Sequence, residues 1–133
     1  MENRYLFRGK RKDNGKWVQG YLYGIWERRY ILWGMTNDIP NMVEADPSTV
    51  CRCTGRKDKN GKLIYENDIV AYWDTYSTDN GQSEADCIGK VVWDDETISF
   101  QVTNRLSAES YEVLDDECSV VGNAIDNPEL LEV

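Results

Sequence analysis

Apolar and polar residues alternate over most of this chain, which is the pattern of β-strands with one face toward water. Residues 17–26 carry apolar side chains on both faces, so we expect this strand to be central in its sheet. Residues 36–46 are less regular, and Pro40 and Pro47 mark loop or edge positions because proline cannot donate to a strand ladder. The N-terminal part thus predicts an antiparallel sheet with strands at residues 5–10, 17–26 and 30–35.

Two turns of similar sequence interrupt the pattern, at residues 12–16 and 57–62. Each contains an Asn-Gly pair, which accepts the positive φ angles of a type I′ hairpin turn. The flanking strands do not match, so two independent turns are favoured over a duplicated unit. Neither turn has the glycine spacing or the Lys-Ser/Thr pair of a phosphate-binding loop.

The order of predicted strands and loops in the second half is that of a small barrel. A strand that opens with Asp-Ile-Val is followed by a long polar loop at residues 74–86 and then by a tight hairpin. This is the order of elements in SH3-like barrels, so we expect such a barrel by fold-level analogy. The strands are predicted at residues 68–73, 88–93, 98–102 and 118–125.

Helical signals are few. Asp126 or Asn127 is placed to cap a short C-terminal helix that begins at Pro128, and residues 106–114 predict one more short helix. The predicted fold class is therefore mainly β. It combines an antiparallel N-terminal sheet with an SH3-like small β-barrel and a short C-terminal helix. We expect one domain over residues 1–133, with possible subdomains at 1–53 and 54–133.

Composition narrows the class of protein. Five Trp and eight Tyr supply enough apolar area that a core needs neither disulfides nor a metal. No segment has the length and apolar character of a signal peptide or a membrane span, so we expect a cytoplasmic protein. In that compartment the four cysteines are expected to be reduced thiols.

Charge is divided unevenly along the chain. Residues 1–66 hold thirteen Lys/Arg against eight Asp/Glu, a net +5, whereas residues 67–133 hold two against sixteen, a net −14. Such a split is compatible with head-to-tail self-association or with an acidic partner for the basic half, but the interpretation we favour is that both halves fold together and their charges neutralise each other across one surface. The overall charge of −9 argues against direct nucleic-acid binding, which needs a concentrated basic surface.

Candidate metal sites are weak. Cys51 and Cys53 would lie on one face of a strand, with Cys87 and Cys118 completing four thiolates, but the spacing is not that of a zinc knuckle. The acidic runs at residues 94–96 and 115–117 lack the spacing of a calcium loop. We therefore expect no metal.

Catalysis has less support still. Histidine is absent, and no Ser or Cys lies in a recognisable nucleophile setting. No pattern points to a cofactor. We therefore expect neither catalytic residues nor an enzyme.

Aromatic residues are better candidates for a functional role, as binding residues. If the barrel analogy holds, several of them line a groove for a peptide or protein, because aromatic anchors dominate interface energetics. The alternative is that they are core residues of a small domain. The candidate partner-binding residues are Tyr72, Trp73, Tyr76 and Trp93.

Three blocks of the chain, taken in order, resemble the YopX protein family. The first is residues 7–10 and 17–22 (FRGK and WVQGYL), which flank the first Asn-Gly turn. The second is residues 54–70 (TGRKDKNGKLIYENDIV). The third joins VGN at 121–123 to NPELL at 127–131. The chain departs from the family pattern at Arg56 and Asn67 and at its cysteines 51 and 53. Asparagine tolerates the left-handed conformation, so we expect the turn at Asn67 to survive.

The resemblance implies a mainly β protein of a phage or prophage with no established activity, and it implies no catalytic residues. We expect an accessory protein that works by self-association or by binding a host or phage protein. The alternative is an acidic nucleic-acid mimic that blocks a host DNA-binding protein.

Overall fold

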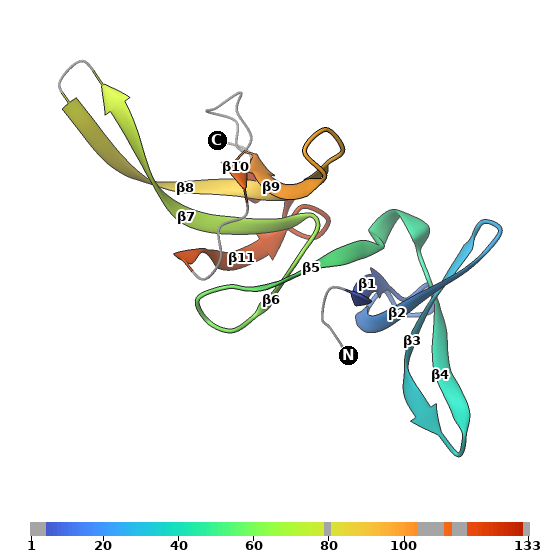
Figure 1. Ribbon diagram of the computed structural model, residues 1–133. Helices are drawn as coiled ribbons and strands as arrows, with labels where there is room; N and C mark the ends of the chain where they lie inside the picture. Colours follow the sequence, from blue (N-terminus) through green and yellow to red (C-terminus); the bar gives the residue numbers. More distant parts are fainter. Residues whose placement is uncertain (1–4, 79–80, 104–110, 113–116, 132–133) are drawn as a thin grey trace. The chain divides into compact units, whose positions relative to one another are not determined.

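The computed structural model describes residues 5–78, 81–103, 111–112 and 117–131, with the side chains of 73–87 and 111–112 left aside. The chain forms two compact units, Met1–Gly55 and Arg56–Val133. Strands make up most of both units (Figure 1). The prediction of a mainly β protein is confirmed, and its strands form two antiparallel sheets.

The first sheet has the strand order β4-β3-β2-β1-β5-β6, in which β5 runs from the first unit into the second. β2 lies between β1 and β3, as expected for a central strand. The strands of this sheet are β1 (Phe7–Lys10), β2 (Trp17–Ile25), β3 (Arg28–Thr36), β4 (Ile39–Ala45), β5 (Cys51–Lys57) and β6 (Leu63–Tyr65).

Both Asn-Gly turns lie where they were predicted, but neither is type I′. Only the glycines take a positive φ, +71° at Gly15 and +81° at Gly61, whereas type I′ needs it at both central residues. These loops are longer than two residues, and side chains hold them: Asn14 Oδ1 accepts from the Lys16 amide at 2.9 Å. The turn that joins β2 to β3 is Trp26-Glu27, so the predicted strand ends one residue early.

Residues 36–46 are more regular than expected. Ile39–Ala45 forms β4, which pairs with β3 across a register shift between Leu32 and Met35. β4 is the outermost strand of its sheet, so the prediction that Pro40 lies at an edge is confirmed.

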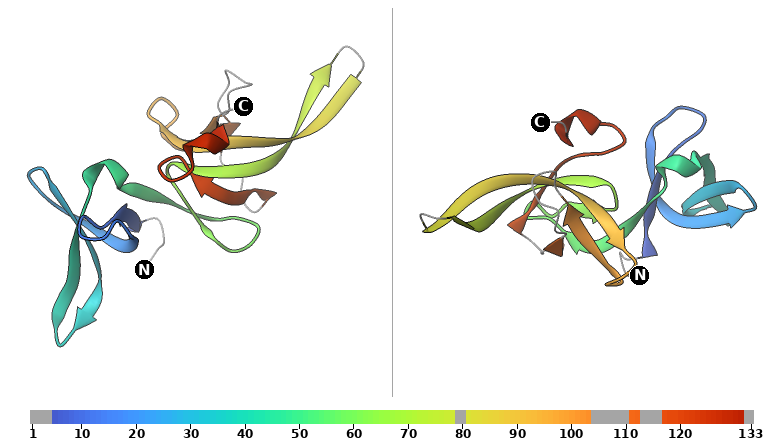
Figure 2. Two further views of the ribbon diagram at one scale, coloured as in Figure 1. Left: turned by 180° about the vertical axis from the view of Figure 1, so that it is seen from behind. Right: turned by 90° about the horizontal axis from the view of Figure 1, so that it is seen from above.

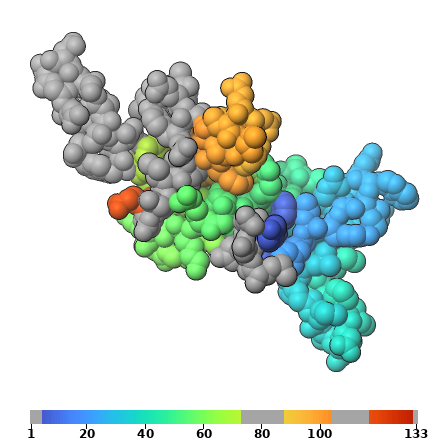
Figure 3. Space-filling view, in the orientation of Figure 1, coloured from blue at the N-terminus to red at the C-terminus, as the bar shows by residue number. Residues whose placement is uncertain are grey.

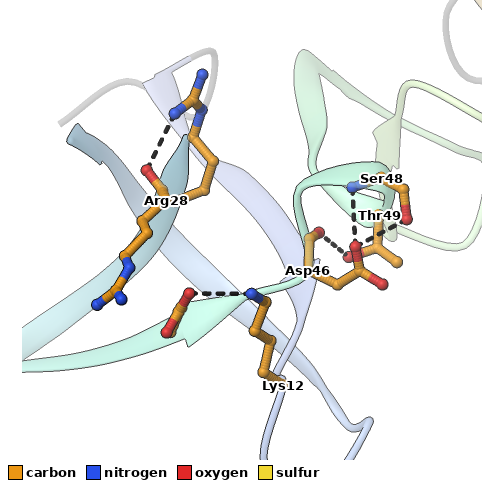
Figure 4. A network of polar contacts seen from close by, with 7 residues as sticks. Lys12, Arg28, Asp46, Ser48 and Thr49 are labelled. Atoms are coloured by element: carbon orange, nitrogen blue, oxygen red, sulfur yellow. Dashed lines mark hydrogen bonds and ion pairs between the residues drawn. The ribbon is translucent and has the colours of Figure 1, made fainter. Parts of the chain in front are cut away.

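A polar network closes the end of β4. Asp46 caps the 3₁₀ helix η2 (Pro47–Thr49): its side chain accepts from the Ser48 amide at 3.0 Å and the Ser48 hydroxyl at 2.8 Å (Figure 4). Lys12 Nζ lies 3.1 Å from Glu44 Oε2, and an isolated bridge pairs Arg11 with Ala45. These contacts connect the end of β4 to the residues that follow β1.

The second unit contains a sheet of strand order β10-β9-β8-β7-β11. β10 and β11 are its outer strands, and no closed barrel is found among the described residues, so the SH3-like detail is not confirmed. The strands are β7 (Asp68–Thr78), β8 (Gly81–Asp94), β9 (Ser99–Thr103), β10 (Tyr111–Glu112) and β11 (Ser119–Asn123).

The predicted polar loop at residues 74–86 is wrong. β7 and β8 pair continuously from Ile69↔Lys90 to Thr78↔Gly81 and form a long twisted ribbon (Figure 2). Polar composition suggested a loop, but a two-stranded ribbon satisfies its backbone hydrogen bonds across the hairpin and needs no buried face there.

The C-terminal segment forms a four-residue 3₁₀ helix, η4 (Pro128–Leu131), so the expected short helix is not confirmed. Asn127 Oδ1 accepts from the amide of Asn123, which precedes the helix, at 3.2 Å, so this bond ties the loop to β11 and does not cap η4. Most of the helix predicted at 106–114 lies outside the described residues, and its described part is strand β10.

Each unit has a small core. In the first unit Ile31, Ala45, Cys51 and Cys53 are buried. In the second, the buried residues form one cluster, against which Tyr72, Phe100 and Val120 pack; its members are Ile64, Val70, Val91, Val102 and Cys118.

Candidate functional site

The four predicted partner-binding aromatics lie on β7 and β8. Tyr72 packs against the core cluster of the second unit. Trp93 meets the ring of Phe100 edge-on at 5.0 Å, and its indole N–H donates to Asp95 Oδ1 at 2.7 Å. Trp73 and Tyr76 lie on β7, but their side chains are outside the described part of the chain. Tyr72 is thus placed against the core, whereas Trp93 contacts Phe100 and Asp95 on the β8–β9 hairpin.

A different aromatic surface is found on the sheet formed by β2, β3 and β4. Cross-strand partners share a face of a sheet, and the register pairs Tyr21 with Leu32 and Tyr23 with Tyr30. Leu32 also pairs with Met42. We call this surface the apolar face; it consists of Tyr21, Tyr23, Ile25, Tyr30, Leu32, Met35 and Met42.

The apolar face is open to water. Met35 is 64% exposed, Met42 51% and Tyr23 46%. Antiparallel sheets normally turn polar residues to solvent, so a contiguous group of exposed apolar side chains marks an interaction surface. The sequence predicts apolar residues on both faces of this strand and a central position for it, but it does not identify this exposed surface.

The charges beside the apolar face are compensated within the first unit. Glu44 pairs with Lys12 at 3.1 Å. The pKa of Arg28 is raised, first by a hydrogen bond with Tyr30 and then by electrostatic interaction with Tyr30 and Glu44. The apolar face itself contains no Asp, Glu, Lys or Arg.

The turn at the end of β2 carries the most exposed large apolar residue of the described chain. Trp26 is 94% exposed and has a φ of +52°. The left-handed region is costly for a bulky side chain and is usually occupied by Gly or Asn. Arg29 braces the turn, because its Nη1 donates to the carbonyl oxygens of Trp26 at 2.8 Å and Arg28 at 3.0 Å.

The turn between β8 and β9 in the second unit has a related design. Ile98 is 75% exposed with a φ of +53°. Asp94 holds the turn, with Oδ1 accepting from the Glu96 amide and Oδ2 from the Thr97 hydroxyl. This turn projects from the surface (Figure 3, orange). We call residues 94–98 the acidic turn and residues 25–29 the tryptophan turn.

No cluster suited to a metal ion is found in the described part of the chain. The thiols of Cys51, Cys53 and Cys118 are buried, and the Cys51 Sγ donates to the Thr49 carbonyl oxygen at 3.2 Å. The side chain of Cys87 lies outside the described residues, so the four-thiolate arrangement stays a hypothesis. The described residues also contain no helix with the length and apolar character that crossing a membrane requires.

The segment at residues 54–70 acts as a structural junction of the second unit. Asp58, 4% exposed, accepts hydrogen bonds from the amides of Asn60, Lys62 and Val120. Asn67 takes a φ of +71°, and its amide donates to the Val91 carbonyl oxygen at 2.8 Å. The expectation that asparagine preserves this turn is confirmed. The segment therefore organises the fold and presents no exposed chemical site of its own.

A family model, that of the YopX protein, matches residues 6–132. The chain belongs to the YopX family. No curated protein matches it. Of the three blocks that carry the resemblance, residues 54–70 are the segment that joins the strands of the second unit, whereas Tyr21 of the first block lies on the apolar face of this YopX protein.

Proposed function

We propose that this YopX protein is a non-enzymatic accessory protein of a phage or prophage that binds another protein chain through its apolar face. The observation that carries the proposal is the exposure of Tyr23, Met35 and Met42 on three paired strands. Burying such a face removes apolar area from water, at about 25 cal/mol per Å².

The composition of the face supports a protein partner. Tyrosine and methionine are enriched at protein interfaces, while charged residues are depleted at interface centres. The apolar face contains no Asp, Glu, Lys or Arg, and Glu44 at its side is paired with Lys12. A neutral aromatic surface suits another protein better than a phosphate backbone, which attracts clustered cations.

The rival hypothesis, an acidic mimic of nucleic acid, requires carboxylates spaced like phosphates along one extended face. The described acidic turn holds Asp94, Asp95 and Glu96 at a single hairpin end, with Asp94 and Asp95 engaged in internal hydrogen bonds. No described observation favours the mimic over a binding protein.

Oxidation of methionine tests the proposal directly. Met35 and Met42 are exposed in the isolated chain, so dilute purified protein treated with hydrogen peroxide should form both sulfoxides quickly. Added to host bacterial extract, or concentrated, the same protein should show slower oxidation of these two residues, quantified by mass spectrometry of its peptides.

The matched control is free methionine added to each reaction, which reports how much peroxide the extract itself consumes. Equal oxidation rates in buffer and extract and at every concentration, after that correction, would overturn the proposal. Protection already present in dilute monomeric protein would overturn it too, because the chain would then cover its own face.

A further inference from the structure

We propose that the tryptophan turn and apolar face of one copy dock onto the acidic turn of a second copy, so that the chain assembles head to tail. This inference rests on the proposed function, because it names the partner of the same apolar face. The proposed occupant of the face is a second copy of this chain. The basis is the charge and the backbone conformation of two hairpin turns.

The two turns share an unusual design. Trp26 and Ile98 are both bulky, both in the left-handed region, and 94% and 75% exposed. Gly or Asn would relieve the backbone at either position without loss of a buried contact. Holding a large apolar side chain outward at such a cost is expected of an anchor residue that is buried only on binding.

The charges of the two turns are complementary. Arg28 and Arg29 follow Trp26, whereas Asp94, Asp95 and Glu96 precede Ile98. The same contrast holds for the whole units. The first unit has nine Lys/Arg against six Asp/Glu, net +3, and the second has six against eighteen, net −12, which sum to −9. Opposite potentials steer two such surfaces together and exclude pairing of like with like.

The free edge of the sheet does not offer a competing route. The carbonyl oxygen of Glu44 accepts from the Lys12 amide at 3.0 Å, which shows that Glu44 turns its backbone outward. Residues two and four positions earlier, Met42 and Pro40, turn outward as well. Pro40 has no N–H to donate, so the outer edge of β4 lacks one ladder donor, which disfavours strand addition there and favours docking by faces and turns.

Because the docked surfaces differ, the contact is heterologous, and one copy leaves a free turn of each kind for the next. Charge reversal tests this on the full chain. Arg28 and Glu96 are exposed, so Arg28→Glu and Glu96→Lys change the turns without touching the core. The weight-average molar mass is measured by light scattering from about 10 to 300 μM, the range of weak complexes, in about 0.05 and 0.5 M salt.

Wild type should gain mass with concentration at low salt and lose most of that gain at high salt. Each single variant should associate about tenfold more weakly, and the double variant Arg28→Glu with Glu96→Lys should return to within about threefold of wild type. Lys16→Glu and Glu129→Lys make the same charge changes at other exposed positions and should shift association less than about twofold. Circular dichroism melting verifies that every variant is folded.

A wild-type mass that stays monomeric at every concentration overturns head-to-tail assembly. Head-to-tail assembly is also overturned if the double variant does not restore association. In a contact between two identical turns, the double charge reversal would not restore association. These failures are distinguishable from failure of the proposed function, since Met35 and Met42 would still be protected in host extract if another protein covers the face.

Discussion

The carboxylate of Asp58 accepts a hydrogen bond from the backbone amide of Val120, 62 positions further along the chain, at 2.9 Å. Its other oxygen holds the amides of Asn60 and Lys62, both at 2.9 Å. One side chain thus shapes the hairpin turn between β5 and β6 and fastens that turn to β11. The turn and the closing strand of the second unit are therefore expected to unfold together.

Replacing Asp58 by alanine should lower the free energy of unfolding by about 3 kcal/mol, because three amides lose a charged acceptor in a buried site. Urea denaturation followed by circular dichroism measures the change. Asp13→Ala is the matched control: Asp13 lies in the other Asn-Gly hairpin and makes an exposed ion pair with Arg11, so its loss should cost under about 1 kcal/mol. Equal costs for the two variants would contradict the role given to Asp58.

Asp58 also makes stability depend on pH. Burial of its carboxyl acts to raise the pKa, but the amides of Val120, Lys62 and Asn60 and the charge of Lys62 outweigh burial, and the pKa of Asp58 lies below its ordinary value of 3.8. A carboxyl with a depressed folded pKa stabilises the fold at pH values above 3.8 and loses that contribution as the pH falls through the folded pKa.

The variant Asp58→Asn isolates this contribution. The difference in free energy of unfolding between wild type and Asp58→Asn should be constant from neutral pH down to about 4.5 and should shrink below about 3.8. Urea titrations at a series of pH values measure it. A difference that is unchanged down to the acid end of the series would show that the carboxylate is not what stabilises the turn.

Local chemistry explains which parts of the fold were predictable. Both Asn-Gly turns and the left-handed Asn67 follow from residues within a few positions of each other. The contact between Asp58 and Val120 does not, because nothing near Asp58 in the chain specifies which distant amide it meets. Closure of a barrel is likewise a long-range property, and the sheet of the second unit stays open with β10 and β11 outermost.

The candidate site illustrates the same limit. Alternation along β2 correctly places Tyr21, Tyr23 and Ile25 on one face, but periodicity cannot tell whether that face is covered. The aromatics of the second unit were chosen for their position beside a loop that is in fact a strand pair. Tyr72 packs against its core and Trp93 against Phe100, whereas among the described side chains the exposed aromatics lie in the first unit.

Trp26→Asn should stabilise the isolated chain, because asparagine accepts a positive φ that tryptophan adopts at a cost. We expect the free energy of unfolding to rise by about 1 kcal/mol, measured by urea denaturation at a concentration low enough to keep the protein monomeric. Ile25→Asn, at an exposed position in the preceding strand, should instead be destabilising by up to about 1 kcal/mol. Destabilisation by Trp26→Asn would mean that the indole makes a contact that stabilises the monomer.

Gly20 marks the point where β2 changes partners. Phe7 of β1 pairs with Gly20, whereas the next residue, Tyr21, pairs with Leu32 of β3. A Cβ added to Gly20 would collide with the carbonyl oxygen of Leu32, which is backbone and cannot rotate away. The absence of a side chain at Gly20 is therefore what lets β3 approach β2 at this point.

Gly20→Ala should lower the free energy of unfolding by about 3 kcal/mol, because relief of the collision requires a backbone shift in packed structure. Gly15→Ala separates this effect from backbone strain: Gly15 has a φ of +71° and no neighbouring atom within 4 Å of an added Cβ, so the cost there should be about 1 kcal/mol. Thermal unfolding followed by circular dichroism ranks the two variants. If Gly15→Ala proves as harmful as Gly20→Ala, positive φ rather than close approach limits the glycine positions of this unit, and the junction of β1, β2 and β3 tolerates a methyl group.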